Sequence, residues 1–285
     1  DSVNSLAEYW VKVASVSGTV DTVFYMYYRT TDTADGADPT NVWDASFAAV
    51  YHLNGSYNGT AGEVKDSTAA AANGTATDPA TQVTGQISQA QNFNGDTDYT
   101  TLTDLAAINY QADFTTEILA NTDGIGAKNF RTIWWKSANI EIRHDTDNSL
   151  RQLNFNTKNP VIAAVDISTA TWYHIAFTWD WLVTTGNAKI YQNGTQKDNS
   201  DGDTFAGAGT GAMILGRGNG TGREWDGILE EFRISTTVRT AAWLRRTKTP
   251  RRDWSAPPAG NTTCSRSGPT GSAASRIPSW AGWWR

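Results

Sequence analysis

Apolar and polar residues alternate along most of the chain in runs of strand length. Clear runs lie at residues 46–55, 89–102, 113–121, 130–157, 171–181, 188–199, 211–219 and 224–235. Alternation with a period of two predicts β-strands, and turn residues interrupt it here about every 8–12 positions. A short helical pattern occurs only at residues 240–248. The pattern therefore predicts an all-β sandwich with one short helix near its end.

The N-terminal part carries two further alternating runs, at residues 7–16 and 21–30, on either side of a turn. This arrangement predicts a β-hairpin. A turn-rich connector at residues 33–44 follows and marks a candidate domain boundary. Residues 59–85 are rich in Ala, Thr, Gly and Asn with little apolar pattern, so we expect a long surface excursion there.

The C-terminal part is rich in Pro, Ser, Gly and Arg and shows no strand pattern. Such a composition predicts a poorly ordered tail unless its terminal tryptophans, Trp280, Trp283 and Trp284, dock elsewhere. The expected organisation is a β segment at 1–44, a sandwich domain at 45–248 and a tail at 249–285.

Composition limits the classes of partner and function that the chain can have. The chain has 285 residues and a net charge of −6 without a basic stripe, so a nucleic-acid partner is not expected. A single cysteine, Cys264, excludes an internal disulfide. No window approaches the roughly 18 apolar residues of a membrane span. Thirteen tryptophans exceed what a core of this size needs, which favours carbohydrate contact through ring stacking.

Five pieces of the chain occur in a recognisable order: AQNFNGDTDYTTL, TWYHIAFTWD, AKIYQNGTQ, MILGRGNG and WDGILEEFRISTTVRTAAWLRR. Together they resemble a bacterial LamG-like domain of the concanavalin A-like lectin/glucanase class, over residues 47–246. The resemblance implies a jelly-roll sandwich of two antiparallel sheets in a secreted or cell-surface protein. Residues 7–44 resemble the end of the DUF2341 module, which often precedes LamG-like domains.

The stretch GREWDGILEEFRIS raises the question of catalysis, because it crowds carboxylates around a tryptophan. Strict alternation places five of its residues on the core face: Asp226, Ile228, Glu230, Phe232 and Ile234. A buried Glu230 would then need a cation or a close hydrogen-bond donor. The carboxylates do not repeat the spacing of a glucanase strand. The enzyme alternative is an atypical pair, Glu141 with Glu230 or Glu231 on neighbouring strands, at glycosidase spacing.

Candidate glycan contacts are aromatic and arginine side chains in the predicted strands and loops. They are Trp135, Trp181, Trp225, Arg143 and Arg223. Alternation buries roughly half of the tryptophans, and we expect Trp172 and Trp179 in the core.

Calcium is the expected cofactor. The turn NGDTDY packs oxygen-bearing side chains closely, as Ca²⁺ requires. The family resemblance implies one rim site, with Asp96, Asp98 and Asp226 as candidate ligands. The alternative is an Asx-turn without metal. The three histidines, His52, His144 and His174, are far apart in sequence, so a zinc site is not expected.

These features predict a non-catalytic carbohydrate-binding or adhesion module of a secreted or surface bacterial protein, with a polysaccharide or glycan as partner. Two alternatives stay open. One is a glycoside hydrolase of the same fold class. The other is a structural surface-layer or filament protein that self-associates through exchanged segments.

Overall fold

A computed structural model describes residues 10–13, 15, 19, 24–28, 37–108, 111–126, 128, 130–136, 140–147, 149–153, 161–162, 166–201, 211, 213–247 and 273–277. The chain forms two compact units, Asp1–Val42 with Arg251–Arg285, and Trp43–Pro250. Among the described residues, none of the helices has the length and apolarity required to cross a bilayer.

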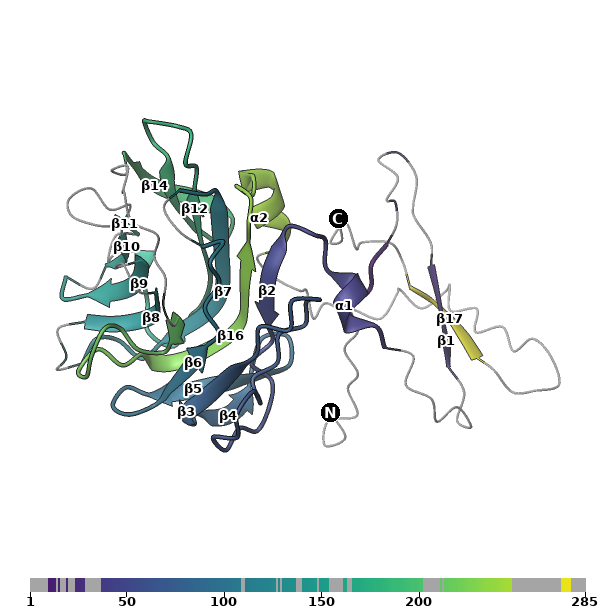
Figure 1. Ribbon diagram of the computed structural model, residues 1–285, viewed down its shortest axis with the longest axis horizontal. Helices are drawn as coiled ribbons and strands as arrows, with labels where there is room; N and C mark the ends of the chain where they lie inside the picture. The colour runs from purple at the N-terminus through teal and green to yellow at the C-terminus, as the bar shows by residue number, and fades with distance from the viewer. Residues whose placement is uncertain are drawn as a thin grey trace. The chain divides into compact units, whose positions relative to one another are not determined.

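The larger unit consists of two antiparallel sheets (Figure 1). The seven-stranded sheet has the order β11 (Val161–Ile162), β10 (Leu150–Leu153), β9 (Ile140–Asp145), β8 (Phe130–Lys136), β15 (Met213–Leu215), β6 (Tyr99–Leu102), β3 (Gly74–Asp78). The eight-stranded sheet has the order β14 (Thr195–Ser200), β13 (Ala188–Gln192), β12 (Trp172–Trp179), β7 (Phe114–Thr122), β16 (Asp226–Ser235), β5 (Gln89–Asn94), β4 (Thr81–Thr84), and β2 (Phe47–Tyr51) also pairs with β16. The predicted all-β fold of two antiparallel sheets is confirmed.

The core lies between the two sheets and follows from the alternation. In β12, Ile175, Phe177 and Trp179 point inward and are almost completely buried, as the sequence predicts for Trp179. Each such side chain contributes about 1.5–3 kcal/mol by leaving water. Trp172 has the opposite parity, shares the outer face with His174 and is only half-buried, so its predicted place in the core is wrong.

Two predictions about irregular segments need correction. Residues 59–85, expected as a surface excursion, contain the edge strands β3 and β4. In the smaller unit, β1 (Phe24–Tyr28) pairs antiparallel with β17 (Ala273–Ile277), in the tail where no strand was expected. The unit also contains α1 (Pro39–Val42). The predicted strand at 7–16 and the terminal tryptophans lie largely or wholly outside the described residues.

The predicted face of β16 is also wrong over its first half. The pairing of β16 with β7 shifts register between Glu230 and Arg233, and Glu231 has a φ of 55°. This bulge adds one residue, so the residues that face the core change parity. Leu229 faces the core before the bulge, and Phe232 and Ile234 face it afterwards. Glu230 therefore lies on the outer face of the sheet.

The predicted C-terminal helix is confirmed as α2 (Ala241–Thr247). Thr240 precedes it and caps it, because its Oγ1 accepts a hydrogen bond from the Trp243 amide at 3.2 Å. Leu244 is fully buried against Ala176 and Tyr191. The helix thus covers part of the outer face of the eight-stranded sheet.

Candidate functional site

The outer face of the seven-stranded sheet carries aromatic rings and arginines that are neither fully buried nor fully exposed. We call this set the arginine–aromatic face: Tyr99, Phe130, Trp135, Arg143, Arg217 and Arg223. The strands point Tyr99, Phe130, Trp135 and Arg143 outward because their neighbours point inward, and the loop after β15 supplies Arg217 and Arg223. Ile140 and Ile142 belong to the core, so Glu141 and Arg143 of β9 face away from it. Trp135 pairs in register with Glu141 and shares that face.

Stacking contacts organise this face. The guanidinium of Arg143 lies 4.0 Å from the centroid of Phe130, and that of Arg223 lies 5.2 Å from the same ring. The guanidinium of Arg217 lies 3.4 Å from the Tyr99 ring. Each arginine therefore contacts an aromatic ring by a cation–π interaction, and both the arginines and the rings remain partly exposed.

The loop after β15 brings two of these arginines onto the sheet. The Thr132 amide donates to the Arg223 carbonyl at 3.0 Å, which fixes the loop against β8. Gly218 allows this close approach. A Cβ there would lie 2.7 Å from Thr132 Oγ1 and 2.9 Å from Glu141 Oε1, so a larger residue would displace these side chains or the loop. The positions of Arg217 and Arg223 therefore depend on a glycine between them.

The carboxylates on this face are engaged with neighbours. Glu141 is only 4% exposed, accepts a hydrogen bond from Thr132 Oγ1, and lies 3.9 Å from Arg223 Nη1. Asp145 pairs with Arg143 Nη2 at 2.9 Å. Burial acts to raise the pKa of Asp145, but the hydrogen bond from Arg143 and the charges of Arg143 and Arg151 outweigh it and lower that pKa. Asp145 stays ionised and orients Arg143.

The structure brings together some of the predicted site residues and separates others. Trp135, Arg143, Arg223 and Glu141 lie on one face, as described above. Trp225 is fully buried in the core, so it is not accessible for stacking on a sugar. Trp181 follows β12 in the other sheet, where its amide donates to Asp113 and its ring packs partly against the core.

Sequence reasoning missed Tyr99, Phe130 and Arg217. Tyr99 begins β6 with the parity opposite to the buried Leu102, so alternation along β6 is a signal for it. Alternation gives no such signal for Phe130, because β8 shifts register between Thr132 and Trp134. Arg217 belongs to the loop after β15. Nothing in the local sequence indicates which ring it contacts.

Glu230 has a structural role on the other sheet. Its carboxylate accepts hydrogen bonds from three consecutive amides, at 2.6 Å from Gln86, 2.9 Å from Ile87 and 2.8 Å from Ser88. Burial raises the pKa of Glu230, with the three amides acting in the opposite direction. The carboxylate thus holds the turn between β4 and β5, and the partner required for a buried Glu230 is this backbone.

Glu231 faces a different set of partners. Its Oε1 lies 2.6 Å from His52 Nδ1 and its Oε2 accepts from Arg233 Nη2 at 2.8 Å. Burial acts to raise the pKa of Glu231, but His52 and Arg233 outweigh it and lower that pKa. The proposed pairing of Glu141 with either residue on a neighbouring strand is wrong. Glu141 belongs to the seven-stranded sheet, whereas Glu230 and Glu231 belong to the eight-stranded one.

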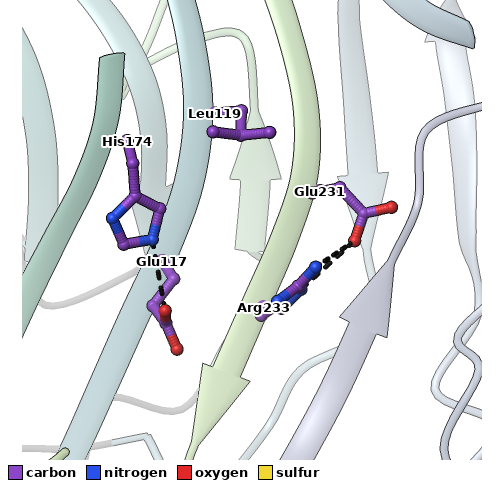
Figure 2. A pocket seen from close by; sticks show the side chains of 5 residues that line it. All are labelled: Glu117, Leu119, His174, Glu231 and Arg233. Atoms are coloured by element: carbon purple, nitrogen blue, oxygen red, sulfur yellow. Dashed lines mark hydrogen bonds and ion pairs between the residues drawn. The ribbon is translucent and has the colours of Figure 1, made fainter. Parts of the chain in front are cut away.

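A small pocket lies on the outer face of the eight-stranded sheet. It is lined by Glu117, Leu119, His174, Glu231 and Arg233. Figure 2 shows Glu117 of β7 paired with His174 of β12, at 3.2 Å, apart from the Glu231–Arg233 pair of β16. The empty volume is about 180 Å³, below the roughly 300 Å³ at which ligand pockets begin. The pocket is lined by two separate side-chain pairs, Glu117 with His174 and Glu231 with Arg233.

The three predicted calcium ligands have separate partners. Asp96 is exposed and lies 3.3 Å from Lys128 Nζ. Asp98 accepts from the Asn94 amide at 3.0 Å, and Asp226 pairs with Arg131 at 3.0 Å. Burial raises the pKa of both Asp98 and Asp226.

The turn that contains Asp96 and Asp98 is held by Asn94. Asn94 Oδ1 accepts from the amides of Asp96 at 2.8 Å and Thr97 at 2.9 Å, which is an Asx-turn. Within the parts of the chain that the structure describes, no three His, Cys, Asp or Glu side chains are grouped for a metal ion.

Two facing antiparallel sheets with this strand order define a lectin-like β-sandwich. The model of the concanavalin A-like lectin/glucanase superfamily matches residues 94–245, which is more than half of the 285-residue chain. The chain belongs to this superfamily. No curated protein sequence matches it.

Solved structures are similar to this chain. Domain 4 of AbnA, a GH43 extracellular arabinanase from Geobacillus stearothermophilus in complex with arabinotriose, is 20% identical, with coverage of 70% of this chain and 97% of that one and a TM-score of 0.48. The binding domain of Paraclostridial Mosquitocidal Protein 1 is 16% identical, with coverage of 70% and 51% and a TM-score of 0.51. Trypanosoma rangeli sialidase in complex with sialic acid is 13% identical, with coverage of 71% and 32% and a TM-score of 0.55. The match spans about half of the second structure and a third of the third, and it shows the fold alone.

Proposed function

We propose that this chain is a non-catalytic carbohydrate-binding or adhesion module and that the arginine–aromatic face binds the glycan. The observation that carries the proposal is the clustering of three half-exposed rings and three arginines on one sheet face. Aromatic rings stack on the apolar C–H faces of sugars. Planar guanidinium groups donate hydrogen bonds in a fixed fork to sugar oxygens or carboxylates. The face supplies both kinds of contact side by side.

The carboxylates of this face favour binding over hydrolysis. A retaining glycosidase needs two carboxyl groups about 5 Å apart, and an inverting one about 6.5–9.5 Å. Glu141 and Asp145 share the outer face of β9 but are four residues apart, about 13 Å along the strand. Both are engaged by arginine. Such carboxylates support orientation of the arginines and offer no acid–base pair.

The test is a panel of immobilised polysaccharides exposed to the full chain, with retained protein and released reducing ends measured in the same wells. We expect retention without release. In the Trp135→Ala variant, binding should weaken about tenfold, because a lost stacking contact contributes about 1–1.5 kcal/mol. Trp172→Ala is the matched control, since Trp172 is a half-buried tryptophan on the other sheet.

Three outcomes separate the alternatives. Retention that Trp135→Ala reduces and Trp172→Ala leaves unchanged supports the proposed face. Equal effects of the two substitutions would place binding elsewhere or attribute it to lost stability. Release of reducing ends would overturn the non-catalytic assignment.

Three further predictions from the sequence belong with this proposal. They are a secreted or cell-surface location, a DUF2341-like N-terminal segment, and self-association. The family resemblance supports the first two. Size-exclusion chromatography of the full chain tests the third.

A further inference from the structure

Backbone oxygens from three separate segments converge on the side chain of Arg131. Its Nη1 donates to the carbonyls of Gly95 and, at 3.1 Å, of Glu224. Its Nε donates to the Ile125 carbonyl at 3.1 Å. Its Nη2 pairs with Asp226 Oδ2 at 3.0 Å. The side chain is only 6% exposed, so this guanidinium is enclosed by the rim of the sandwich.

Glycines shape the space around the guanidinium. Gly95 has a φ of 71°, and a Cβ there would lie 2.4 Å from Arg131 Nη1 and 2.7 Å from Asp226 Cγ. A Cβ at Gly126, with a φ of 55°, would lie 3.1 Å from Arg131 Nη2. Both turns approach the guanidinium so closely because they lack side chains there.

A second cation extends the arrangement. Lys128 Nζ lies 3.3 Å from Asp96 Oδ1 and 3.3 Å from Glu224 Oε2. The same Glu224 carboxylate accepts the Gly222 amide at 3.0 Å. Lys128 and Arg131 therefore pair with three carboxylates at this rim, those of Asp96, Glu224 and Asp226.

These oxygens are of the kind that bind calcium, but they already surround a positive charge. Ca²⁺ takes six to eight carboxylate, carbonyl and water oxygens. Here three carbonyls and one carboxylate receive N–H donors from Arg131. A divalent cation beside a buried guanidinium would meet strong repulsion, because the low dielectric inside the protein screens it weakly. The rim residues do not fit calcium while Arg131 is in place.

We propose that Arg131 is the resident cation of this rim and replaces the calcium ion that the superfamily resemblance implies. The guanidinium ties together the turn at 94–98, the loop after β7 and the entry into β16. Removal of the guanidinium converts the same oxygens into a site for a divalent cation. The rim of the native chain is therefore ordered without calcium.

The test compares thermal unfolding of the full chain in chelator and in millimolar CaCl₂, together with tryptophan-sensitised luminescence of Tb³⁺, which prefers the same oxygen ligands. The wild-type chain should have the same unfolding midpoint in both buffers and show no luminescence. Arg131→Ala should unfold about 10 °C lower in chelator, because three backbone carbonyls and the Asp226 carboxylate lose their hydrogen-bond donor. Calcium should recover part of that loss, and Tb³⁺ luminescence should appear.

Two further variants test the proposal separately from Arg131→Ala. Arg151→Ala removes an arginine that pairs with Asp147 outside the rim, and it should show no calcium response. Arg131→Lys keeps a charge but cannot reach the three carbonyls, so it should lower the midpoint in chelator without calcium recovery.

The outcomes are distinct and do not depend on glycan binding. Calcium-dependent stabilisation or Tb³⁺ luminescence of the wild-type chain overturns the proposal. An Arg131→Ala variant that is as stable as wild type in chelator also overturns it. If that variant does not fold, the wild-type measurements and Arg131→Lys decide. Failure of calcium to stabilise a folded Arg131→Ala variant overturns the claim that the oxygens form a latent cation site.

Discussion

The two outer faces of the sandwich carry the same kinds of residues but differ in what covers them. On the eight-stranded sheet, Arg233 lies 5.4 Å from the ring of Trp43, which is only 8% exposed, and Trp243 of α2 donates to Glu117. On the seven-stranded sheet, the rings of the arginine–aromatic face stay half-exposed. Residue type alone therefore does not determine which outer face is accessible to a ligand. Coverage by flanking segments does.

This difference changes what a charge contributes. A buried ion pair costs desolvation energy, and removal of one partner leaves the other charge unpaired in a low dielectric. An exposed pair contributes about 0–1 kcal/mol. We call the outer face of the eight-stranded sheet the covered face and the arginine–aromatic face the open face. The comparison between them predicts large effects on stability at the covered face and small ones at the open face.

The largest effect is expected at Glu231. The Glu231→Gln substitution removes the carboxylate between His52 and Arg233, so the free energy of unfolding should fall by about 3 kcal/mol, measured by urea denaturation. Asp147→Asn is the control, because Asp147 is half exposed and pairs at the surface with Arg151. A loss at Glu231 no larger than that of the control would remove the distinction between the faces.

Acid should abolish the difference between wild type and Glu231→Gln. The folded pKa of Glu231 lies below its ordinary value of 4.5. Its ionisation therefore stabilises the fold above that value, and the contribution disappears as the pH falls through the folded pKa. The free-energy gap between the two proteins should be full at about pH 6 and narrow below about pH 4. A gap that is independent of pH would contradict the assigned pairing.

A smaller and local effect is expected at Glu230. The Glu230→Gln substitution keeps the side-chain shape but replaces one acceptor oxygen by an NH₂ group, so at least one of the three amides loses its acceptor, at a cost of about 1–3 kcal/mol. Hydrogen exchange at the amides of Gln86, Ile87 and Ser88 should accelerate, while exchange in β12 changes less. Uniform acceleration throughout the sandwich would instead indicate global destabilisation.

The smallest effect on stability is expected at Arg223, on the open face. Its side chain is 34% exposed and 3.9 Å from Glu141, so Arg223→Ala should change the free energy of unfolding by less than about 1 kcal/mol. Glycan retention should weaken several-fold in the same variant, measured on the polysaccharide identified in the panel. Loss of stability without loss of retention would assign Arg223 to loop support alone.

The pattern of apolar positions is sufficient to predict most strands and the helix α2, because alternate residues of most strands enter the core and the helix packs one side on the sheet. It fails at β16, where the bulge at Glu231 changes which residues face the core. A period-two pattern contains no sign of an inserted residue. Apolar and charged residues occur at both parities around the bulge, so the sequence is compatible with either set facing the core. The pairing of β16 with β7 determines which set does.

The candidate site was predictable in part for the same reason. Trp135, Arg143 and Glu141 lie on paired strands, and outward parity brings them together once β8 and β9 are neighbours. The convergence on Arg131 was not predictable. Its partners, Gly95, Ile125 and Glu224, come from loops far apart in sequence and contribute backbone carbonyls, which side-chain identity does not reveal.

The pairing of β2 with β16 has a mechanical consequence. These first and last long strands of the domain are antiparallel neighbours, and Phe47 pairs with Ser235 beside the Asp44–Arg239 ion pair. The start of β2, where the chain enters the sandwich, therefore lies beside the end of β16, where the chain leaves it. If α2 detaches from the sheet, a force that pulls the start of β2 away from the end of β16 would break the β2–β16 hydrogen bonds one after another. It would not load all of these hydrogen bonds at once, as a force along the strands would.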